Sequence, residues 1–275
     1  MKTARRRFCV AAGALALAPA RAAAAEPLRI ALAPFLSPNA LLATYRPLRE
    51  HLERSLARPV EMLTAKDFRT LAEEARRDTE FDVVQFPAHL ARLAMLDWRY
   101  EQVGAPTERV TVVVVVRGAG PVRAPADLRE RTVGMLDPLS LTATVGRRWL
   151  QEQGLAEQVR VSALPSVNSG FYALEREEVA AFIAADTQLL TLPADTPRGE
   201  RVLARLTDIP GPLFVASPRM AAATLARLRA AMGRFAPDPA RPATAANSPF
   251  RLIEPARLAQ LDPLVAIARQ ALATR

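Results

Sequence analysis

Cysteine and histidine are scarce in this chain, which has one cysteine and two histidines in 275 residues. Cys9 lies ahead of residue 26, so the rest of the chain has no cysteine for a disulfide, a thiol nucleophile or a cysteine-ligated metal. His51 and His89 are too few for a histidine-rich metal cage. We therefore expect no metal and no other cofactor.

Motifs of catalysis are also missing. No G-x-S-x-G nucleophile elbow occurs, neither histidine stands in a recognisable order with a nucleophile, and no paired-carboxylate signature is found. These absences argue against an enzyme. An enzyme that turns over an organophosphate in a cleft is the weaker alternative.

Lysine is nearly absent, since only Lys2 and Lys66 occur and arginine supplies almost all of the positive charge. A GC-rich genome explains this bias better than a surface for nucleic acid, because no basic run interleaved with aromatic residues follows the N-terminal segment. Five basic and no acidic residues lie in residues 1–25, and their removal lowers the net charge from +9 to +4. We expect no nucleic-acid partner.

No apolar run reaches the roughly 20 residues that a transmembrane helix needs. The N-terminus instead has a basic stretch, an apolar run of about a dozen residues and the small residues Ala23–Ala25. This arrangement predicts a signal peptide over residues 1–25, cleaved near Ala25, and a periplasmic mature protein. The run Arg5–Phe8 fits both a twin-arginine signal and an arginine-rich Sec leader, and the sequence leaves both routes open.

Beyond the leader, strand-like and helix-like segments alternate. Leu28–Ala33 reads as a buried strand, and a stripe at spacings of 4, 3 and 4 then marks one helix face, formed by Leu41, Tyr45, Leu48 and Leu52. The same rhythm predicts strands at 60–64, 81–85, 110–116, 131–136, 159–164, 179–184 and 209–216, and helices at 68–77, 87–96, 142–153, 170–177, 225–235 and 258–273. The alternation predicts a parallel sheet with helices on both faces.

Two α/β cycles are separated near the middle of the chain. Val110–Val116 is apolar on both faces, as expected for a central strand that passes from one lobe into another. The Gly/Pro/Ala stretch 118–125 follows it, and a second cycle begins after that stretch. About 250 mature residues are enough for one large domain or two lobes.

Four segments carry a resemblance to a known family: Leu28–Ser37, Tyr45–Pro59, Phe81–Leu93 and Val133–Thr144. They resemble the substrate-binding proteins of ATP-binding-cassette (ABC) transporters for phosphate, phosphite and phosphonates. The resemblance covers most of the mature chain in order. It implies an α/β, two-lobed type II periplasmic binding protein fold with two crossover strands.

The resemblance also implies how the chain is divided. Lobe 1 is discontinuous and takes residues 26–114 and 210–275, whereas lobe 2 takes residues 115–209. The implied function is that of an exported solute-binding protein, which captures a phosphorus-containing or related oxyanion between the lobes and delivers it to an ABC permease. The alternative is a periplasmic ligand-binding sensor that signals to a membrane receptor or kinase without transport. We expect a monomer in either case.

Ligands of open α/β sheets bind beyond the carboxyl ends of the strands, where helix N-termini offer backbone N–H groups to anions. Loops 35–39, 85–89, 137–144 and 166–169 meet this description. The candidate ligand-binding residues are Ser37, Phe86, His89, Ser140, Thr142, Thr144, Asn168, Ser169 and Asp186.

The third loop offers three hydroxyls, from Ser140, Thr142 and Thr144, where a helix is expected to start. Hydroxyls donate hydrogen bonds to phosphoryl oxygens, but Ser140 or Thr142 also fits the role of a helix cap. His89 falls on the first turn of another helix and reads either as a pH-sensitive ligand contact or as a packed, partly buried side chain.

The sequence departs from the family pattern in two loops. Leu141 and Ala143 replace polar or glycine positions of the Ser-Thr-Ser-Gly turn found in phosphonate-binding members. Val167 stands where relatives tend to have a histidine, and the strand after it lacks their aspartate, a role that Asp186 can take in part. The ligand therefore stays open between a small oxyanion and an uncharged or larger solute.

Overall fold

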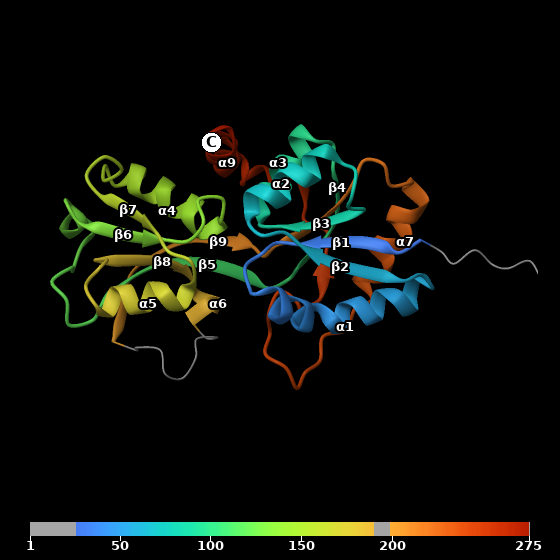
Figure 1. Ribbon diagram of the computed structural model, residues 1–275, viewed down its shortest axis with the longest axis horizontal. Coiled ribbons are helices and arrows are strands. Elements are labelled where there is room, and N and C mark those ends of the chain that lie inside the picture. Colours follow the sequence, from blue (N-terminus) through green and yellow to red (C-terminus); the bar gives the residue numbers. More distant parts are fainter. Residues whose placement is uncertain (1–25, 190–198, 275) are drawn as a thin grey trace, which may run out of the picture.

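A computed structural model describes residues 26–189 and 199–274, which form two α/β halves that lie side by side (Figure 1). The predicted signal peptide, with Cys9 and the arginine run, lies outside the described residues. Within the described part, no helix has both the length and the apolar character that crossing a membrane requires.

The first half is built on a six-stranded sheet in the order β11-β4-β10-β3-β1-β2. Its strands are β1 (Leu28–Leu32), β2 (Val60–Thr64), β3 (Val83–Phe86), β4 (Glu101–Pro106), β10 (Leu213–Ala216) and β11 (Phe250–Arg251). β1 runs parallel to β2 and β3, whereas β10 runs antiparallel to β3 and β4. We call this part of the molecule the six-stranded half.

The second half, the five-stranded half, has the strand order β7-β6-β8-β5-β9. Its strands are β5 (Arg109–Arg117), β6 (Thr132–Met135), β7 (Arg160–Ala163), β8 (Ala181–Ala185) and β9 (Glu200–Pro210). β6 is parallel to β7 and β8, but β5 is antiparallel to both of its neighbours. The predicted parallel arrangement is therefore right for three strands in each sheet. It is wrong for β10 and β5, which run opposite to both of their neighbours. β4 and β9 therefore also lie in antiparallel pairs, although they run in the same direction as the parallel strands of their sheets.

Helices cover both faces of each sheet, as predicted (Figure 1). The longer ones are α1 (Pro38–Leu56), α2 (Phe68–Arg77), α3 (Ala88–Asp97), α4 (Leu141–Glu152), α5 (Val167–Glu175), α7 (Ala222–Gly233) and α9 (Asp262–Ala273). Shorter turns are η1 (Pro125–Leu128), α6 (Asp186–Leu189) and α8 (Pro255–Ala259). α1 starts after Ser37 and buries the whole predicted stripe, from Leu41 to Leu52.

Two connections join the halves, at residues 107–108 between β4 and β5 and at residues 211–212 between β9 and β10. β5 and β9, of nine and eleven residues, pair with each other from Arg109 opposite Pro210 to Arg117 opposite Glu200. The two crossovers therefore lie next to each other, which confirms the predicted pair. The first expected lobe boundary, between residues 114 and 115, lies inside β5.

The single return strand predicted over 209–216 is in fact the end of β9 and all of β10. Gly211–Pro212 separates them, because proline has no N–H for a sheet ladder. Gly211 also has a steric reason to be glycine: a Cβ here would come within 2.8 Å of Pro106 Cγ and 3.0 Å of the Glu108 carbonyl oxygen. The two crossovers therefore lie so close together at Gly211 that its Cα can carry a hydrogen atom but not a side chain.

One apolar layer runs across both halves. α9 lies over their junction and packs against α3 of the six-stranded half and α4 of the five-stranded half (Figure 1). It buries Leu264, Val265 and Ala268 in a cluster that includes residues of both sheets. The opposite faces of the two sheets form separate clusters, one under α1 and α7 and one under α5. The halves are therefore joined by a shared core on the α9 side only.

Charged groups fix α9 to the six-stranded half. Arg92 forms two hydrogen bonds to Asp262, at 2.8 and 3.3 Å, and Arg269 forms two to Asp97, at 2.8 and 2.6 Å. The hydrogen bonds from Arg269 lower the pKa of Asp97. Arg69 on α2 donates to three carbonyl oxygens at the C-terminus of α9, at 2.6 to 2.9 Å. A guanidinium is favourable there, because the last carbonyls of a helix lack partners and carry partial negative charge.

We expect Leu264→Ala to lower the free energy of unfolding by about 2–5 kcal/mol, because it opens a cavity in the layer that joins the halves. Urea denaturation of residues 26–275 measures this. Leu252→Ala is the matched control: Leu252 is 57% exposed, and its truncation should change the stability by no more than about 0.5 kcal/mol. Equal effects of the two substitutions would contradict a shared core under α9.

Candidate functional site

The carboxyl ends of the parallel strands in the two sheets face each other across the junction. α3 follows β3 in one half and α4 follows β6 in the other. The helices meet where His89 Nε2 lies 3.2 Å from Thr144 Oγ1. Two of the four predicted loops are thus in direct contact, although they are more than 50 residues apart in the chain.

His89 is completely buried at this contact. Burial lowers its pKa to about 3, and the nearby Leu139 backbone opposes this only in part. Among the described residues, Nδ1 has no partner within normal hydrogen-bond geometry. The first turn of α3 also disfavours a positive charge, because the helix dipole has its positive end there. His89 is therefore a neutral hydrogen-bonding group and supplies no charge to an anion.

The three hydroxyls of the third loop stand at the predicted start of a helix, α4, and bond to one another and to the backbone. Ser140 caps α4 by accepting from the Ala143 N–H at 3.2 Å, and its Oγ lies 3.2 Å from Thr142 Oγ1. Thr144 donates to the Ser140 carbonyl oxygen at 2.9 Å and is fully buried against His89. Ser140 and Thr142 keep 6% and 5% exposure, so they are the members of the group nearest to solvent.

Asp137, at the start of the third loop, is a junction residue that we did not single out from the sequence. Its Oδ1 accepts from the Leu139 N–H at 2.7 Å. Burial is the main cause of its raised pKa, and the negative charge of Asp67 on the other half adds to it, while the Leu139 N–H and Arg69 oppose it. The two aspartates thus act on each other across the junction. The sequence feature that could have identified Asp137 is its position directly after the predicted buried strand 131–136.

The fourth loop has the same construction as the third. Ser166 caps α5 by accepting from the Ser169 N–H at 3.1 Å, and the two hydroxyl oxygens lie 2.8 Å apart. Asn168 is half-buried on the same first turn. Asp186 starts α6 and accepts from the Thr111 N–H at 3.2 Å, so it ties the end of β8 to the start of β5. All of these groups follow the carboxyl ends of strands in the five-stranded half.

The first and second loops place their candidates differently. Ser37 is exposed at the N-terminus of α1, and its side chain makes no capping hydrogen bond. Phe35 beside it is 39% exposed. Phe86 is fully buried, with its ring edge-on to Trp98 at a centroid distance of 6.2 Å, so it packs in the core of the six-stranded half in this arrangement. Tyr45 is also core, and its hydroxyl accepts from the Gln85 amide at 2.7 Å.

Taken together, His89, Ser140, Thr142 and Thr144 form one contact group. The hydroxyls and amides of Ser37, Asn168 and Ser169 and the carboxylate of Asp186 lie at other strand ends. Direct contact of any of these residues with a ligand stays a prediction.

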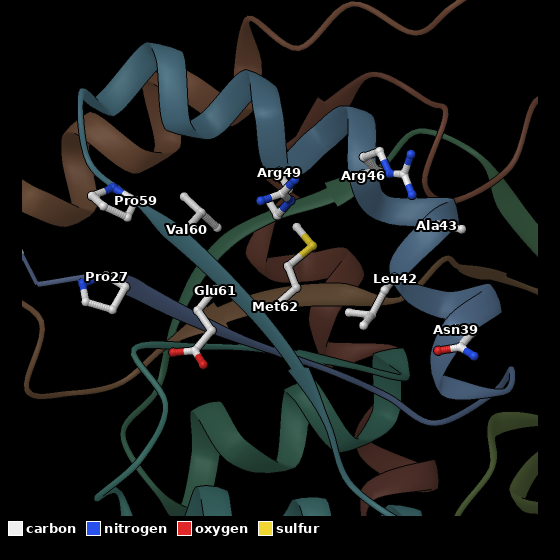
Figure 2. Close-up of a pocket in the computed structure, with 10 residues that line it drawn as sticks. All are labelled: Pro27, Asn39, Leu42, Ala43, Arg46, Arg49, Pro59, Val60, Glu61 and Met62. Carbon is white, nitrogen blue, oxygen red and sulfur yellow. The ribbon is translucent and has the colours of Figure 1, made fainter.

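A large hollow lies elsewhere, on the outer side of the six-stranded half. It encloses about 690 Å³ between α1 and the edge strand β2. Figure 2 shows Arg46, Arg49, Leu42 and Met62 among its lining residues. None of the candidate ligand-binding residues lines it.

A comparison with protein families shows to which family the chain belongs. The family described as ABC transporter, phosphonate, periplasmic substrate-binding protein matches residues 30–261. The chain belongs to this family. The family is a periplasmic transport component that binds substrate rather than an enzyme. No curated protein matches the chain by sequence.

Several solved structures are similar to this family member. One is XAC2383 from Xanthomonas citri bound to ATP, which is 17% identical in sequence and has a TM-score of 0.72. The match covers 88% of this chain and 97% of the XAC2383 chain. Another is PA3383, a binding-protein component of an ABC phosphonate transporter from Pseudomonas aeruginosa, which is 16% identical and has a TM-score of 0.71. The match covers 89% of this chain and 87% of the PA3383 chain. A third is PhnD1 from Prochlorococcus marinus in complex with methylphosphonate, which is 11% identical and has a TM-score of 0.72. The match covers 89% of this chain and 97% of the PhnD1 chain. The chain therefore has the type II periplasmic binding protein fold that the sequence predicts.

We expect this binding protein to lose stability as the pH falls below about 6.5, the ordinary pKa of histidine, towards about 3. The pKa of His89 is lower in the folded protein than in the unfolded chain. Acid therefore protonates the unfolded chain preferentially, and the stabilisation is complete only above the unfolded pKa. His89→Gln should make the melting temperature depend less on pH between about 6.5 and 4.

Thermal unfolding at a series of pH values measures both chains. His51→Gln is the matched control, because His51 is only half-buried and bonds to the Ala231 carbonyl oxygen on α7, away from the junction. It should keep the wild-type pH dependence. A wild-type pH dependence in His89→Gln as well would show that this histidine is not held neutral by the fold.

Proposed function

We propose that the chain is exported to the periplasm, captures a phosphorus-containing oxyanion between two lobes and delivers it to an ABC permease. The family match over residues 30–261 is the observation that carries this proposal. It favours transport over the sensing alternative, because the family is defined as part of ABC transporters.

We assign the lobes to the two sheets. The six-stranded half with its helices is lobe 1, the five-stranded half is lobe 2, and the adjacent crossovers at residues 107–108 and 211–212 act as the hinge. Hinges are commonly a few residues at the ends of elements that absorb a change in backbone angles. Because the shared core lies on the α9 side, the lobes part on the opposite side, towards α1 and α5.

The ligand class is supported by two of the similar structures, which hold methylphosphonate and ATP, both of which are phosphorus oxyanions. The N-termini of α1, α4 and α5 supply backbone N–H groups and the positive ends of helix dipoles. The hydroxyls of Ser37, Ser140 and Thr142 add donors at these ends.

Charge at the proposed site limits the form of the ligand. Arg69 is engaged by the C-terminus of α9, His89 is neutral, and Asp67 and Asp137 are close by. A doubly charged anion meets repulsion from these carboxylates, whereas a singly protonated phosphonate donates its P–OH to one of them. We therefore propose that the monoanionic form is the one that binds.

We expect methylphosphonate, phosphate or phosphite to raise the melting temperature of residues 26–275. A ligand at 100 times its dissociation constant stabilises by about 2.7 kcal/mol, which corresponds to roughly 5–10 °C for this size. Ser140→Ala with Thr142→Ala should abolish that increase. Loss of the cap alone lowers the free energy of unfolding by about 1 kcal/mol, and with it the unliganded melting temperature. The test is therefore the change in melting temperature on adding ligand.

Ser55→Ala with Thr224→Ala removes the same two hydroxyl types from α1 and α7, away from the junction, and should keep the full ligand-induced increase. An increase that survives in the Ser140/Thr142 variant excludes the third loop from the site. No increase with any phosphorus oxyanion would mean that the fold is shared and the family's chemistry is not.

A further inference from the structure

A second hollow lies behind the junction, on the side that α9 covers. It encloses about 320 Å³ between α4 and β9 of the five-stranded half and α8 and α9 of the C-terminal segment. None of the candidate residues of the strand-end loops lines it. It is therefore separate from the ligand site proposed above.

The floor of this hollow is apolar. Trp149 on α4 is 8% exposed, and Ile209 on β9 and Leu264 on α9 are each 4% exposed. Small-molecule sites in proteins are mostly apolar hollows of about 300–1,000 Å³ with a few polar groups at defined places. The size here suits a compact ligand, and the indole offers a flat surface for an apolar body.

The rim of the hollow is positively charged. Arg148, Arg205 and Arg257 come from three different elements, α4, β9 and α8, and Glu152 is the one carboxylate that joins them in the lining. Glu152 accepts from Arg148 at 2.7 Å. Among the side chains that the structure describes, neither Arg205 nor Arg257 forms an ion pair. Two guanidinium groups thus remain for an anion, and guanidinium binds carboxylate and phosphonate groups in a bidentate manner.

We propose that this hollow, lined by Trp149 with Arg205 and Arg257 at its rim, is a second small-molecule site for a compact organic anion. The ligand has one phosphonate or carboxylate head between the two guanidinium groups. Its short aliphatic or aromatic body lies on the apolar floor. The site does not depend on the function proposed for the strand-end loops.

Intrinsic fluorescence reports on this site directly, because Trp98 and Trp149 are the two tryptophans of the chain. Trp98 is partly buried in the other half, where it packs against Phe86 and Tyr100. Trp98→Phe therefore leaves Trp149 as the single reporter. In this background, phenylphosphonate should cause a saturable change in fluorescence. Benzyl alcohol, which lacks the charge, and inorganic phosphate, which lacks the apolar body, should cause none at the same concentrations.

Arg205→Gln with Arg257→Gln should weaken phenylphosphonate binding by at least about tenfold, as expected for the loss of hydrogen bonds to a charged group. Arg234→Gln with Arg241→Gln makes the same change of charge at exposed positions outside the hollow and should leave the affinity unchanged. Ser140→Ala with Thr142→Ala should also leave it unchanged.

The proposal is overturned if phenylphosphonate gives no saturable signal from Trp149, or if the Arg205/Arg257 variant binds as well as its parent. It is also overturned if the Ser140/Thr142 variant loses the signal, because the probe then acts from the strand-end loops. Failure of the transport ligand site appears separately, as a missing thermal response to methylphosphonate, phosphate and phosphite in the unmodified chain.

Discussion

The packing of α9 against both α3 and α4 is the contact on which the rest of the arrangement depends. It continues one apolar layer from the six-stranded half into the five-stranded half, while the opposite faces keep separate cores. Because burial of apolar surface is the main favourable term in folding, the halves are held together along this one side. The strand ends then face each other beside the layer, and the second hollow forms where α9 and α8 leave β9 uncovered.

Burial, rather than the count of charged residues, sets the electrostatics of the junction. The same loss of water lowers the pKa of His89 and raises that of Asp137, so both groups are pushed towards their uncharged forms. An anion at the strand-end loops, as proposed, would therefore be held by backbone N–H groups and hydroxyls rather than by a positive side chain. The hollow behind α9 has the opposite character, because its guanidinium groups stay exposed to solvent.

Local patterns in the sequence predicted the regular elements well. The stripe of α1 is buried as expected, and α2 occupies the predicted residues 68–77. β4 was missed because Glu101–Pro106 contains glycine, alanine and proline, which are poor strand formers, and only its neighbours β10 and β11 make it a strand. Most of β9 was missed because this edge strand carries charged residues. The hydroxyls at the start of α4 were predictable from capping rules, but their contact with His89 depends on how the halves pack.

β5 has a further consequence, for the way in which the chain reaches its folded form. Its valines, Val112–Val116, are all fully buried, and their pairing partners in β8 and β9 lie 67 to 92 residues later in the chain. Until those residues have been synthesised and have found their places, a β-branched, uncharged run stays without a partner. Such runs pair readily with other chains. The nascent protein thus needs protection over this segment for longer than over any local helix.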